Sequence, residues 1–374
     1  MSGNLENMYA SCELCARKCR VNRGERAGFC GAGTTLRAAK AMLHYWEEPA
    51  VTSFLPAGEE QNEQPASGAV FFSGCSLKCS YCQNYKISHE GFGKELGPEE
   101  LAAVFLSLQE KGAKNIDLVT PTHYLPGIVK ALTLCGRRPV SDPEYSPRNQ
   151  CALSVPVVYN CGGYENAEVL RSLEGLIDIW LPDVKYFDDG LSVKYSGAPG
   201  YYAFARESLS EMIRQAERAF AREKSGPPAK DRVIVRHMVL PGAYHDSERL
   251  LSALKEAFGT ESFLLSLLNQ YTPFYKACEQ KEINRRLTTL EYQRVLEKAI
   301  DLGFTGFMQE RTSAREEYTP DFDLDGLTFP LPVIKDHAEG TDQPGDPVTD
   351  AYIEEREVDA AHGGDPDHPE QTYA

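Results

Sequence analysis

The stretch AVFFSGCSLKCSYCQNY (69–85) joins an apolar run to a tight group of cysteines. Its first part, AVFFSG (69–74), is apolar throughout rather than alternating, which is typical of a strand buried on both faces. Three cysteines follow with the spacing C-x3-C-x2-C, and so short a spacing brings their sulfur atoms to one centre. The stretch therefore predicts a metal centre at the carboxyl end of a buried strand.

Cys75, Cys79 and Cys82 supply three thiolates, whereas complete ligation of a [4Fe-4S] cube takes four. The fourth iron stays open, as one position of a catalytic zinc does. Structural cysteines or a partial zinc site are the alternatives. The end of the first strand of a β/α array is where barrel enzymes place their active sites, which favours the cluster.

Further apolar runs alternate with amphipathic helix patterns along the chain. These runs are NIDLVT (115–120), VPVVYN (155–160), IDIWLPD (177–183), RVIVRHMVL (232–240), SFLLSLLNQ (262–270) and FTGFMQ (304–309). Strands alternating with helices predict a parallel sheet. About six strands is fewer than the eight of a full TIM barrel. We therefore predict an α/β fold with a partial (β/α)6 TIM-type barrel.

Local signals add detail to this prediction. Pro98 with two glutamates after it suits the first turn of a helix. Thr288 and Glu291 fit a capping box before YQRVLEKAI. The stretch CGRRPVSDPEYSPRNQC (135–151) is expected to be a loop inserted between a helix and the next strand.

The composition divides the chain into four parts. We expect a Cys-rich metal-binding segment at 1–35, a connecting segment at 36–66, the partial barrel at 67–334 and an acidic disordered tail at 335–374. The tail holds twelve Asp and Glu against two Lys and Arg, and so carries -10 of the net charge of -16. It is also poor in large apolar groups, which is typical of disorder.

The N-terminal part contains four cysteines with the spacing C-x2-C-x3-C-x10-C. They are Cys12, Cys15, Cys19 and Cys30. Four thiolates complete a tetrahedral zinc site or close a [4Fe-4S] cube without an open iron. So short a segment with few apolar residues needs a metal to fold. Zinc ribbons usually pair two CxxC motifs. Only one is present here, which slightly favours an iron–sulfur cluster. The two interpretations both stay open.

Charge and hydropathy exclude some classes of function. A net charge of -16 argues against a surface for nucleic acid or anionic membranes, which needs clustered Lys and Arg. We see no signal peptide at the start and no apolar run of about 20 residues. The expected compartment is the cytoplasm, where eleven cysteines indicate metal or redox chemistry rather than disulfides.

The cysteine triplet with Tyr81 before its last member resembles the radical S-adenosylmethionine (SAM) superfamily. A wider set of motifs, in order along residues 12–310, resembles the PflX-like branch related to pyruvate formate-lyase activating enzyme. These motifs are HYWEEP (44–49), FFSGCSLKCSYCQNY (71–85), LVTPTHYLP (118–126), VVYNCGGY (157–164), LPDVKY (181–186) and VRHMVLPG (235–242). The resemblance implies that the open iron binds SAM, and that its reductive cleavage yields a 5′-deoxyadenosyl radical for hydrogen abstraction.

The resemblance also implies contacts to SAM. Asp183 and Lys185 match the family's Asp-x-Lys pair, although a salt-bridged strand end is an equal alternative. The family's Gly-Gly-Glu, which receives the SAM amino group, is replaced here by TPTH (120–123), so the Thr122 hydroxyl or backbone carbonyls are candidate substitutes. Asn160 stands where the family has a polar ribose contact.

Two further residues are candidates from their position alone. Asn84 follows the cysteines closely and is expected to hydrogen-bond near the cluster. His237 ends a strand and is a candidate contact to SAM or substrate. A lone histidine is more often a satisfied structural group.

Three functions are consistent with these residues. The first is a radical SAM enzyme that activates a glycyl-radical partner protein, with flavodoxin or ferredoxin as the reductant. The second keeps the radical chemistry with a small molecule or another peptide as substrate. The third is a non-catalytic iron–sulfur or zinc protein that carries electrons or serves as a scaffold.

Overall fold

All seven apolar runs form β-strands in the computed structural model, which describes residues 5, 7–45, 47–52, 65–223, 226–309 and 320–327. The strands are parallel to one another within each sheet. They are β2 (Ser67–Phe72), β4 (Ile116–Val119), β5 (Val157–Cys161), β6 (Ile179–Pro182), β7 (Ile234–Met238), β8 (Leu264–Leu268) and β9 (Gly306–Met308). The continuous apolar runs were thus sufficient to locate the parallel strands.

The strands form two sheets within the described residues. One has the order β3-β1-β2-β4-β5-β6 and the other the order β7-β8-β9. Two isolated parallel bridges, Trp180 with Val233 and Asp183 with Arg236, join the chain at β6 to the chain at β7. The predicted α/β fold with a mostly parallel sheet is confirmed. The outer strands β3 and β9 are not paired with each other in the described part, so closure into a partial barrel stays a prediction.

The sequence analysis missed two antiparallel strands, β1 (Leu36–His44) and β3 (Lys94–Leu96). β1 pairs with β2 from Ala38 opposite Phe72 to His44 opposite Ser67. The expected connecting segment at 36–66 therefore begins with a strand of the larger sheet. Its sequence LRAAKAMLH contains three Ala and one Lys, residue types that are depleted in strands, and no β-branched or aromatic residue, so it lacked the signal of a strand.

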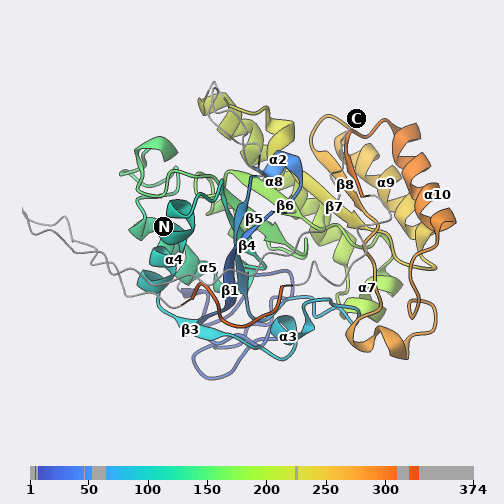
Figure 1. The fold of residues 1–374 in the computed structure, drawn as a ribbon, viewed down its shortest axis with the longest axis horizontal. Helices are drawn as coiled ribbons and strands as arrows, with labels where there is room; N and C mark the ends of the chain where they lie inside the picture. Colours follow the sequence, from blue (N-terminus) through green and yellow to red (C-terminus); the bar gives the residue numbers. More distant parts are fainter. Residues whose placement is uncertain are drawn as a thin grey trace, which may run out of the picture. The chain divides into compact units, whose positions relative to one another are not determined.

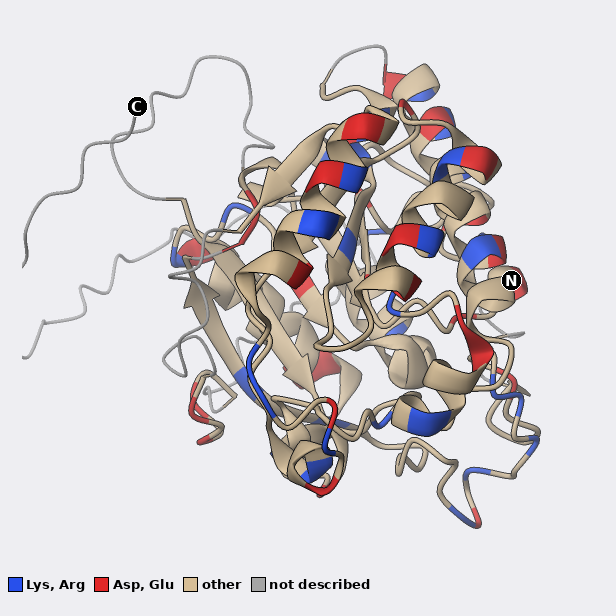
Figure 2. Ribbon diagram, turned by 90° about the vertical axis from the view of Figure 1, so that its right-hand side faces the viewer, with Lys and Arg blue, Asp and Glu red and all other residues tan. Residues whose placement is uncertain are grey.

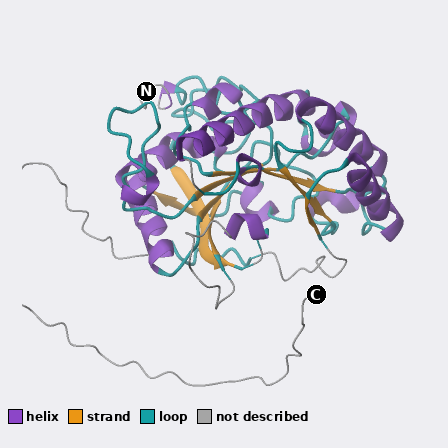
Figure 3. Cartoon of the chain, turned by 90° about the horizontal axis from the view of Figure 1, so that it is seen from above, coloured by secondary structure: helices purple, strands orange, loops and turns teal. Residues whose placement is uncertain are grey.

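Helices pack along the outer face of the curved sheets (Figure 3). The longer ones follow the strands in order and are labelled in Figure 1. They are α4 (Pro98–Glu110), α5 (Leu125–Leu134), α6 (Ala167–Arg171), α7 (Asp189–Ser196), α8 (Tyr201–Glu223), α9 (Tyr244–Phe258) and α10 (Thr289–Leu302). Short turns of helix are α2 (Pro49–Thr52), α3 (Tyr85–Ser88), η1 (Thr122–Tyr124), η2 (Arg148–Gln150), η3 (Ala229–Arg232) and η4 (Tyr275–Glu279).

Both predicted helix starts are confirmed. Glu291 N–H donates to Thr288 Oγ1 at 3.3 Å and Thr288 N–H donates to Glu291 Oε2 at 3.0 Å, which completes the capping box of α10. Pro98 is the first residue of α4. The expected loop at 135–151 contains only turns and η2.

The short helix α2 fills the interior at the amino ends of the strands. Val51 is fully buried and belongs to one apolar cluster with Val158, Ile179 and Ile234 from three strands. Asn115 Nδ2 donates to the Val51 carbonyl at 2.8 Å. Figure 1 shows α2 at the end of the strands opposite α3, so the other end stays available for the cysteine loop.

Residues 320–327 lie along the free side of β1. The Ala41 N–H donates to the Asp325 carbonyl at 3.0 Å and Leu324 N–H donates to the Ala39 carbonyl at 3.1 Å. Lys40 Nζ adds an ion pair to Asp323 at 3.0 Å. The last described residues thus join the first strand of the larger sheet.

The chain divides into residues 1–332 and 333–374. The second part lies outside the described residues, so the acidic tail at 335–374 stays a prediction. No helix among the described residues is long and apolar enough to cross a membrane. Lys and Arg are interspersed with Asp and Glu along the helices that face the viewer in Figure 2.

Candidate functional site

The cysteine loop leaves the carboxyl end of β2 and is fixed by backbone contacts. Gly74 N–H donates to the Ile87 carbonyl at 2.8 Å, and Ser80 N–H donates to the Tyr195 carbonyl at 2.7 Å. Gly74 has φ +89°, and a Cβ there would stand 2.7 Å from the Cys30 carbonyl oxygen. Only glycine therefore fits between the cysteine loop and the N-terminal segment.

Each of the three sulfur atoms in this loop accepts at least one hydrogen bond. Leu77 N–H donates to Cys75 Sγ at 3.4 Å. Ser196 Oγ donates to Cys79 Sγ at 3.1 Å, and Ser88 Oγ donates to Cys82 Sγ at 3.2 Å. Such donors stabilise thiolates and tune the potential of a bound cluster.

Desolvation makes the Cys75 and Cys82 thiols hard to ionise without a metal. It raises the pKa of Cys75 to about 11 and that of Cys82 to about 12, and neighbouring Cys79 adds to both shifts. A desolvated thiolate needs positive charge beside it, which iron supplies. Three neighbouring thiols with a donor on each sulfur therefore fit a [4Fe-4S] cluster.

Asp183 and Lys185 lie beside this loop. Lys185 Nζ donates to Asp183 Oδ2 at 2.5 Å, and both side chains are largely buried. Burial alone lowers the pKa of Lys185, but the Asp183 carboxylate and the nearby Cys79 and Cys82 thiols outweigh it, so the pKa is raised. Lys185 is therefore a cation next to the cysteines. The ion pair agrees with the alternative of a salt-bridged strand end, and contact with SAM stays a prediction.

Asn84 and Thr122 lie in different surroundings. The backbone N–H of Asn84 contacts the Cys82 sulfur, so this residue is at the cysteine loop as expected. Thr122 is buried, and its Oγ1 accepts from Tyr159 Oη at 3.1 Å. Thr122 also bonds to the buried Glu165 carboxyl. Its hydroxyl is thus occupied within the protein, which weakens it as a substitute for the family's glutamate.

His237 is a buried residue with both ring nitrogens occupied. Nδ1 lies 2.7 Å from the Val184 carbonyl and Nε2 lies 2.8 Å from Ser247 Oγ. Because a carbonyl only accepts, Nδ1 carries the proton and Nε2 accepts from the serine. Burial lowers the pKa of His237 to about 4, so the ring is neutral. The geometry favours a structural role: His237 fixes the backbone between Asp183 and Lys185 rather than reaching a cofactor.

A charged layer that the sequence analysis did not assign lies in the interior below this site. Arg236 binds both Glu47 and Glu48, with its Nε 2.7 Å from Glu48 Oε1. Ser266 Oγ donates to the same Glu48 oxygen at 2.8 Å. Glu47 and Glu48 belong to the motif HYWEEP, so this motif brings two carboxylates to Arg236 in the middle of β7.

Asn160 faces the same layer. Its Nδ2 donates to Asp117 Oδ2 at 3.1 Å, while Asp117 Oδ1 is buried without a hydrogen-bond partner among the described residues. Desolvation raises the pKa of Asp117 well above its ordinary value, and the nearby Glu47 carboxylate raises it further. Asp117 is the one charged residue inside the apolar run NIDLVT. Because a buried charge needs a partner, this residue was the sequence signal for a polar interior.

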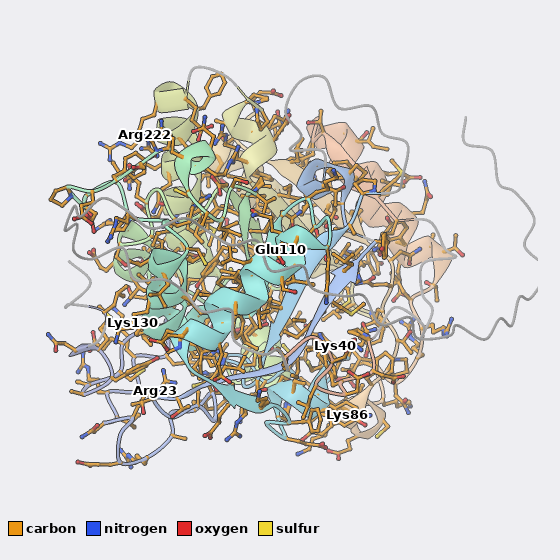
Figure 4. The ribbon with its side chains drawn as sticks, turned by 60° about the vertical axis from the view of Figure 1, so that its left-hand side comes forward. Arg23, Lys40, Lys86, Glu110, Lys130 and Arg222 are labelled. Carbon is orange, nitrogen blue, oxygen red and sulfur yellow. The ribbon has the colours of Figure 1, made fainter. Side chains whose placement is uncertain are left out.

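The four N-terminal cysteines lie together against the cysteine loop. Cys75 N–H donates to the Cys30 carbonyl at 3.2 Å, and Arg17 binds the carbonyls of Ser76 and Gly197. Arg23, labelled in Figure 4, is buried and donates to carbonyls of its own segment and to that of His123. Burial raises the pKa of Cys15, and nearby Cys30 and Cys12 raise it further.

No group of three or more His, Cys, Asp and Glu side chains in the described ranges is close enough to hold a single metal ion. Zinc and an iron–sulfur cluster at the N-terminal cysteines both stay predictions.

The chain was compared with known proteins. An uncharacterized protein of Methanocaldococcus jannaschii is 28% identical over 304 residues, which cover 79% of this chain and 75% of that protein. SuiB of Streptococcus suis bound to S-adenosylmethionine has a TM-score of 0.40 at 12% identity, covering 63% of this chain and 48% of SuiB. A radical SAM methyltransferase of Sphaerobacter thermophilus has a TM-score of 0.40 at 14% identity, covering 65% and 66%. This chain thus spans about half of the length of SuiB.

A family model provides the clearest match. Residues 69–246 match the model of the radical SAM superfamily. The matched range begins in β2, contains the three cysteines of the loop after it and extends into α9. This part of the chain is therefore similar to the radical SAM superfamily.

Proposed function

We propose that this protein is an enzyme that cleaves SAM reductively and uses the resulting radical to abstract hydrogen from a substrate. One observation carries the proposal: three cysteines, each with a hydrogen-bond donor on its sulfur, share one loop at the end of β2. Three ligands suit a cluster with one open iron. When bound, the cluster supplies one electron that breaks a carbon–sulfur bond of SAM into methionine and a 5′-deoxyadenosyl radical.

The side chains around the loop fit this function. Lys185 is a buried cation beside the cysteines and can balance the SAM carboxylate. Asp183 can accept hydrogen bonds from the ammonium or ribose hydroxyl groups of SAM. The apolar cluster around Val51 excludes water from the opposite end of the strands, which protects a reactive radical.

The substrate is not identified by these contacts. Activation of a glycyl-radical partner, and reduction by flavodoxin or ferredoxin, stay predictions that rest on the motifs alone. The interior charged layer of Glu47, Glu48, Asp117 and Arg236 is polar, so it suits a substrate with polar groups.

The test is SAM cleavage by the anaerobically reconstituted protein with dithionite. We expect 5′-deoxyadenosine and methionine from the wild type and from Cys151→Ala, a control in the loop at 135–151. Cys75→Ala should reduce product formation by at least about 10³-fold, because chemistry without the cluster has no electron source. The non-catalytic alternative would stand if Cys75→Ala cleaved SAM as fast as the wild type. It would also stand if the wild type showed intact cluster absorbance but no SAM cleavage.

A further inference from the structure

We propose that Cys12, Cys15, Cys19 and Cys30 hold a second iron–sulfur cluster that passes electrons to the Cys75–Cys82 site. The relay role rests on the proposed function, because it presumes a cluster at that site. The second cluster itself rests on three independent observations: the shape of its loop, the convergence of its thiols and its bonded contact to the first site.

The loop Cys15–Cys19 repeats the backbone design of the loop Cys75–Cys79. Both have the spacing C-x3-C with a lysine before the second cysteine. These lysines, Lys18 and Lys78, have φ +41° and +49°, a region that residues other than glycine seldom occupy.

The first sulfur of each loop is also held in the same way. The N–H two residues after the first cysteine donates to its sulfur in both loops, from Arg17 to Cys15 and from Leu77 to Cys75. The N-terminal segment thus builds a second copy of the loop that we assign to a cluster.

The remaining cysteines complete a set of four thiols. Cys19 Sγ and Cys30 Sγ lie 3.3 and 3.5 Å from the point that a Cβ at position 28 would take, and Gly28 leaves this space free. Four thiols match either zinc or a cube by number. We assign a cube because the loop Cys15–Cys19 has the same backbone design as the loop Cys75–Cys79. Because four thiolates leave no iron open for SAM, we assign electron transfer rather than catalysis to this cluster.

A short bonded path connects the two sets. Cys30 is a ligand of one set and Cys75 of the other, and the Cys75 N–H donates to the Cys30 carbonyl at 3.2 Å. Arg17 locks the two segments together through carbonyls at Ser76, Ser196 and Gly197. Electron transfer depends steeply on distance, so direct backbone contact between two ligands favours it.

The electron balance of the relay is simple. A low-potential one-electron donor protein is oxidised as the N-terminal cluster is reduced. That cluster is reoxidised as the cluster at Cys75–Cys82 gains the electron, which is then consumed in breaking one carbon–sulfur bond of SAM. When the substrate supplies the hydrogen atom, each SAM molecule cleaved takes one electron from the electron-donor protein.

The first experiment counts iron, sulfide and zinc in the full-length protein after anaerobic reconstitution. Two cubes require about eight irons per chain, and Cys15→Ala/Cys19→Ala should retain about four. Cys151→Ala is the matched control and should retain about eight. Zinc in the wild type, or full iron in the double variant, would overturn the second cluster.

A second variant covers the case in which the N-terminal variant fails to fold. Cys75→Ala/Cys79→Ala/Cys82→Ala should keep about four irons, with an electron paramagnetic resonance spectrum of the reduced protein that SAM does not change. An iron-free triple variant would contradict the proposal. A wild type with two clusters that does not cleave SAM would instead refute the proposed function and leave the second cluster standing.

The relay is tested by the choice of reductant. Dithionite is small enough to reduce either site directly, so Cys15→Ala/Cys19→Ala should cleave SAM with it at a rate within about twofold of the wild type. With reduced ferredoxin as donor, the same variant should be slower by about tenfold or more. An equal rate with ferredoxin in the two proteins would overturn the relay.

Discussion

Two of the three sulfur atoms in the cysteine loop accept a hydrogen bond from a serine hydroxyl group. Ser196 is the clearest case, because it is buried and lies 117 residues from Cys79, whose sulfur it contacts. Its own hydroxyl lies 2.8 Å from Tyr186 Oη, which in turn lies 2.6 Å from Tyr81 Oη. A chain of three buried hydroxyl groups thus ends on one ligand of the proposed cluster.

Replacing Ser196 with alanine should make the cluster harder to reduce. Loss of one hydrogen bond to a thiolate, worth about 1 kcal/mol, corresponds to a shift of about 40 mV toward negative potential for one electron. Redox titration of the reconstituted protein measures this. Ser252→Ala, on α9, is the control and should leave the potential unchanged. A potential shifted toward positive values in Ser196→Ala would contradict the assigned role.

At this scale the sequence identified the cysteines but not their partners. The spacing of Cys75, Cys79 and Cys82 is local, so it can be seen without a fold. Ser196 and Ser88 have no distinguishing pattern, and Ser196 meets its sulfur only after α7 has packed against the loop. Glu47 and Glu48 were visible within a motif, but their partner Arg236 could be found only from the fold.

The junction between β6 and β7 is the element that positions the Asp183–Lys185 pair. The two strands meet only through isolated bridges, one of which joins Asp183 to Arg236. His237 on β7 adds a side-chain contact to the Val184 carbonyl, and its other nitrogen contacts Ser247 on α9. This one ring therefore links a loop, a strand and a helix.

Protonation of His237 should loosen this junction at acid pH. Its pKa is about 4 in the folded protein against 6.5 for an exposed histidine, so the unfolded chain binds the proton more tightly. The neutral His237 ring therefore makes its full contribution to the free energy of unfolding above pH 6.5. This contribution of about 3 kcal/mol is lost as the pH falls toward 4.

Urea unfolding of iron-free protein at pH 7 and pH 5 measures this effect. Glutamine cannot titrate. From pH 7 to pH 5 the free energy of unfolding of His237→Gln should therefore fall by about 2 kcal/mol less than that of the wild type. His245→Gln, at an exposed position of α9, should behave as the wild type does. An identical pH dependence in His237→Gln and wild type would contradict the assignment.

Whole elements were predicted unevenly. Continuous apolar runs located all the parallel strands, because burial on both faces leaves a strong signal. β1 was missed because it contains three alanines and a lysine and no β-branched or aromatic residue, and its place is determined by pairing with β2 rather than by its own preference. The pairing of β6 with β7 through two bridges has no local signal at all.

The interior of the molecule is layered along the strands. Apolar residues around Val51 fill one end, the charged layer with Arg236 follows, and the cysteine loop lies at the other end. Burial raises the pKa of both Glu47 and Glu48, and Arg236 reverses this for Glu48 but not for Glu47. The layer is stable because one arginine serves two carboxylates.

Replacing Arg236 with methionine should destabilise the whole fold. It leaves two buried carboxylates without their cation, which costs about 3–5 kcal/mol in the free energy of unfolding. Arg249→Met removes an exposed ion pair to Asp188 and should cost at most about 1 kcal/mol.

Urea unfolding of the two variants at pH 7 tests this difference. The triple variant Glu47→Gln/Glu48→Gln/Arg236→Met should recover part of the loss, because it removes the unpaired charges. Equal stability of Arg236→Met and Arg249→Met would show that the charged layer is not a stabilising element.

The bonds from residues 324 and 325 to β1 have a consequence for biosynthesis. The first strand emerges from the ribosome long before its last neighbour, since Lys40 and Asp323 are 283 positions apart. Until then one side of β1 presents bare backbone groups to any nascent chain nearby. The larger sheet therefore gains these contacts only after residue 325 has been synthesised.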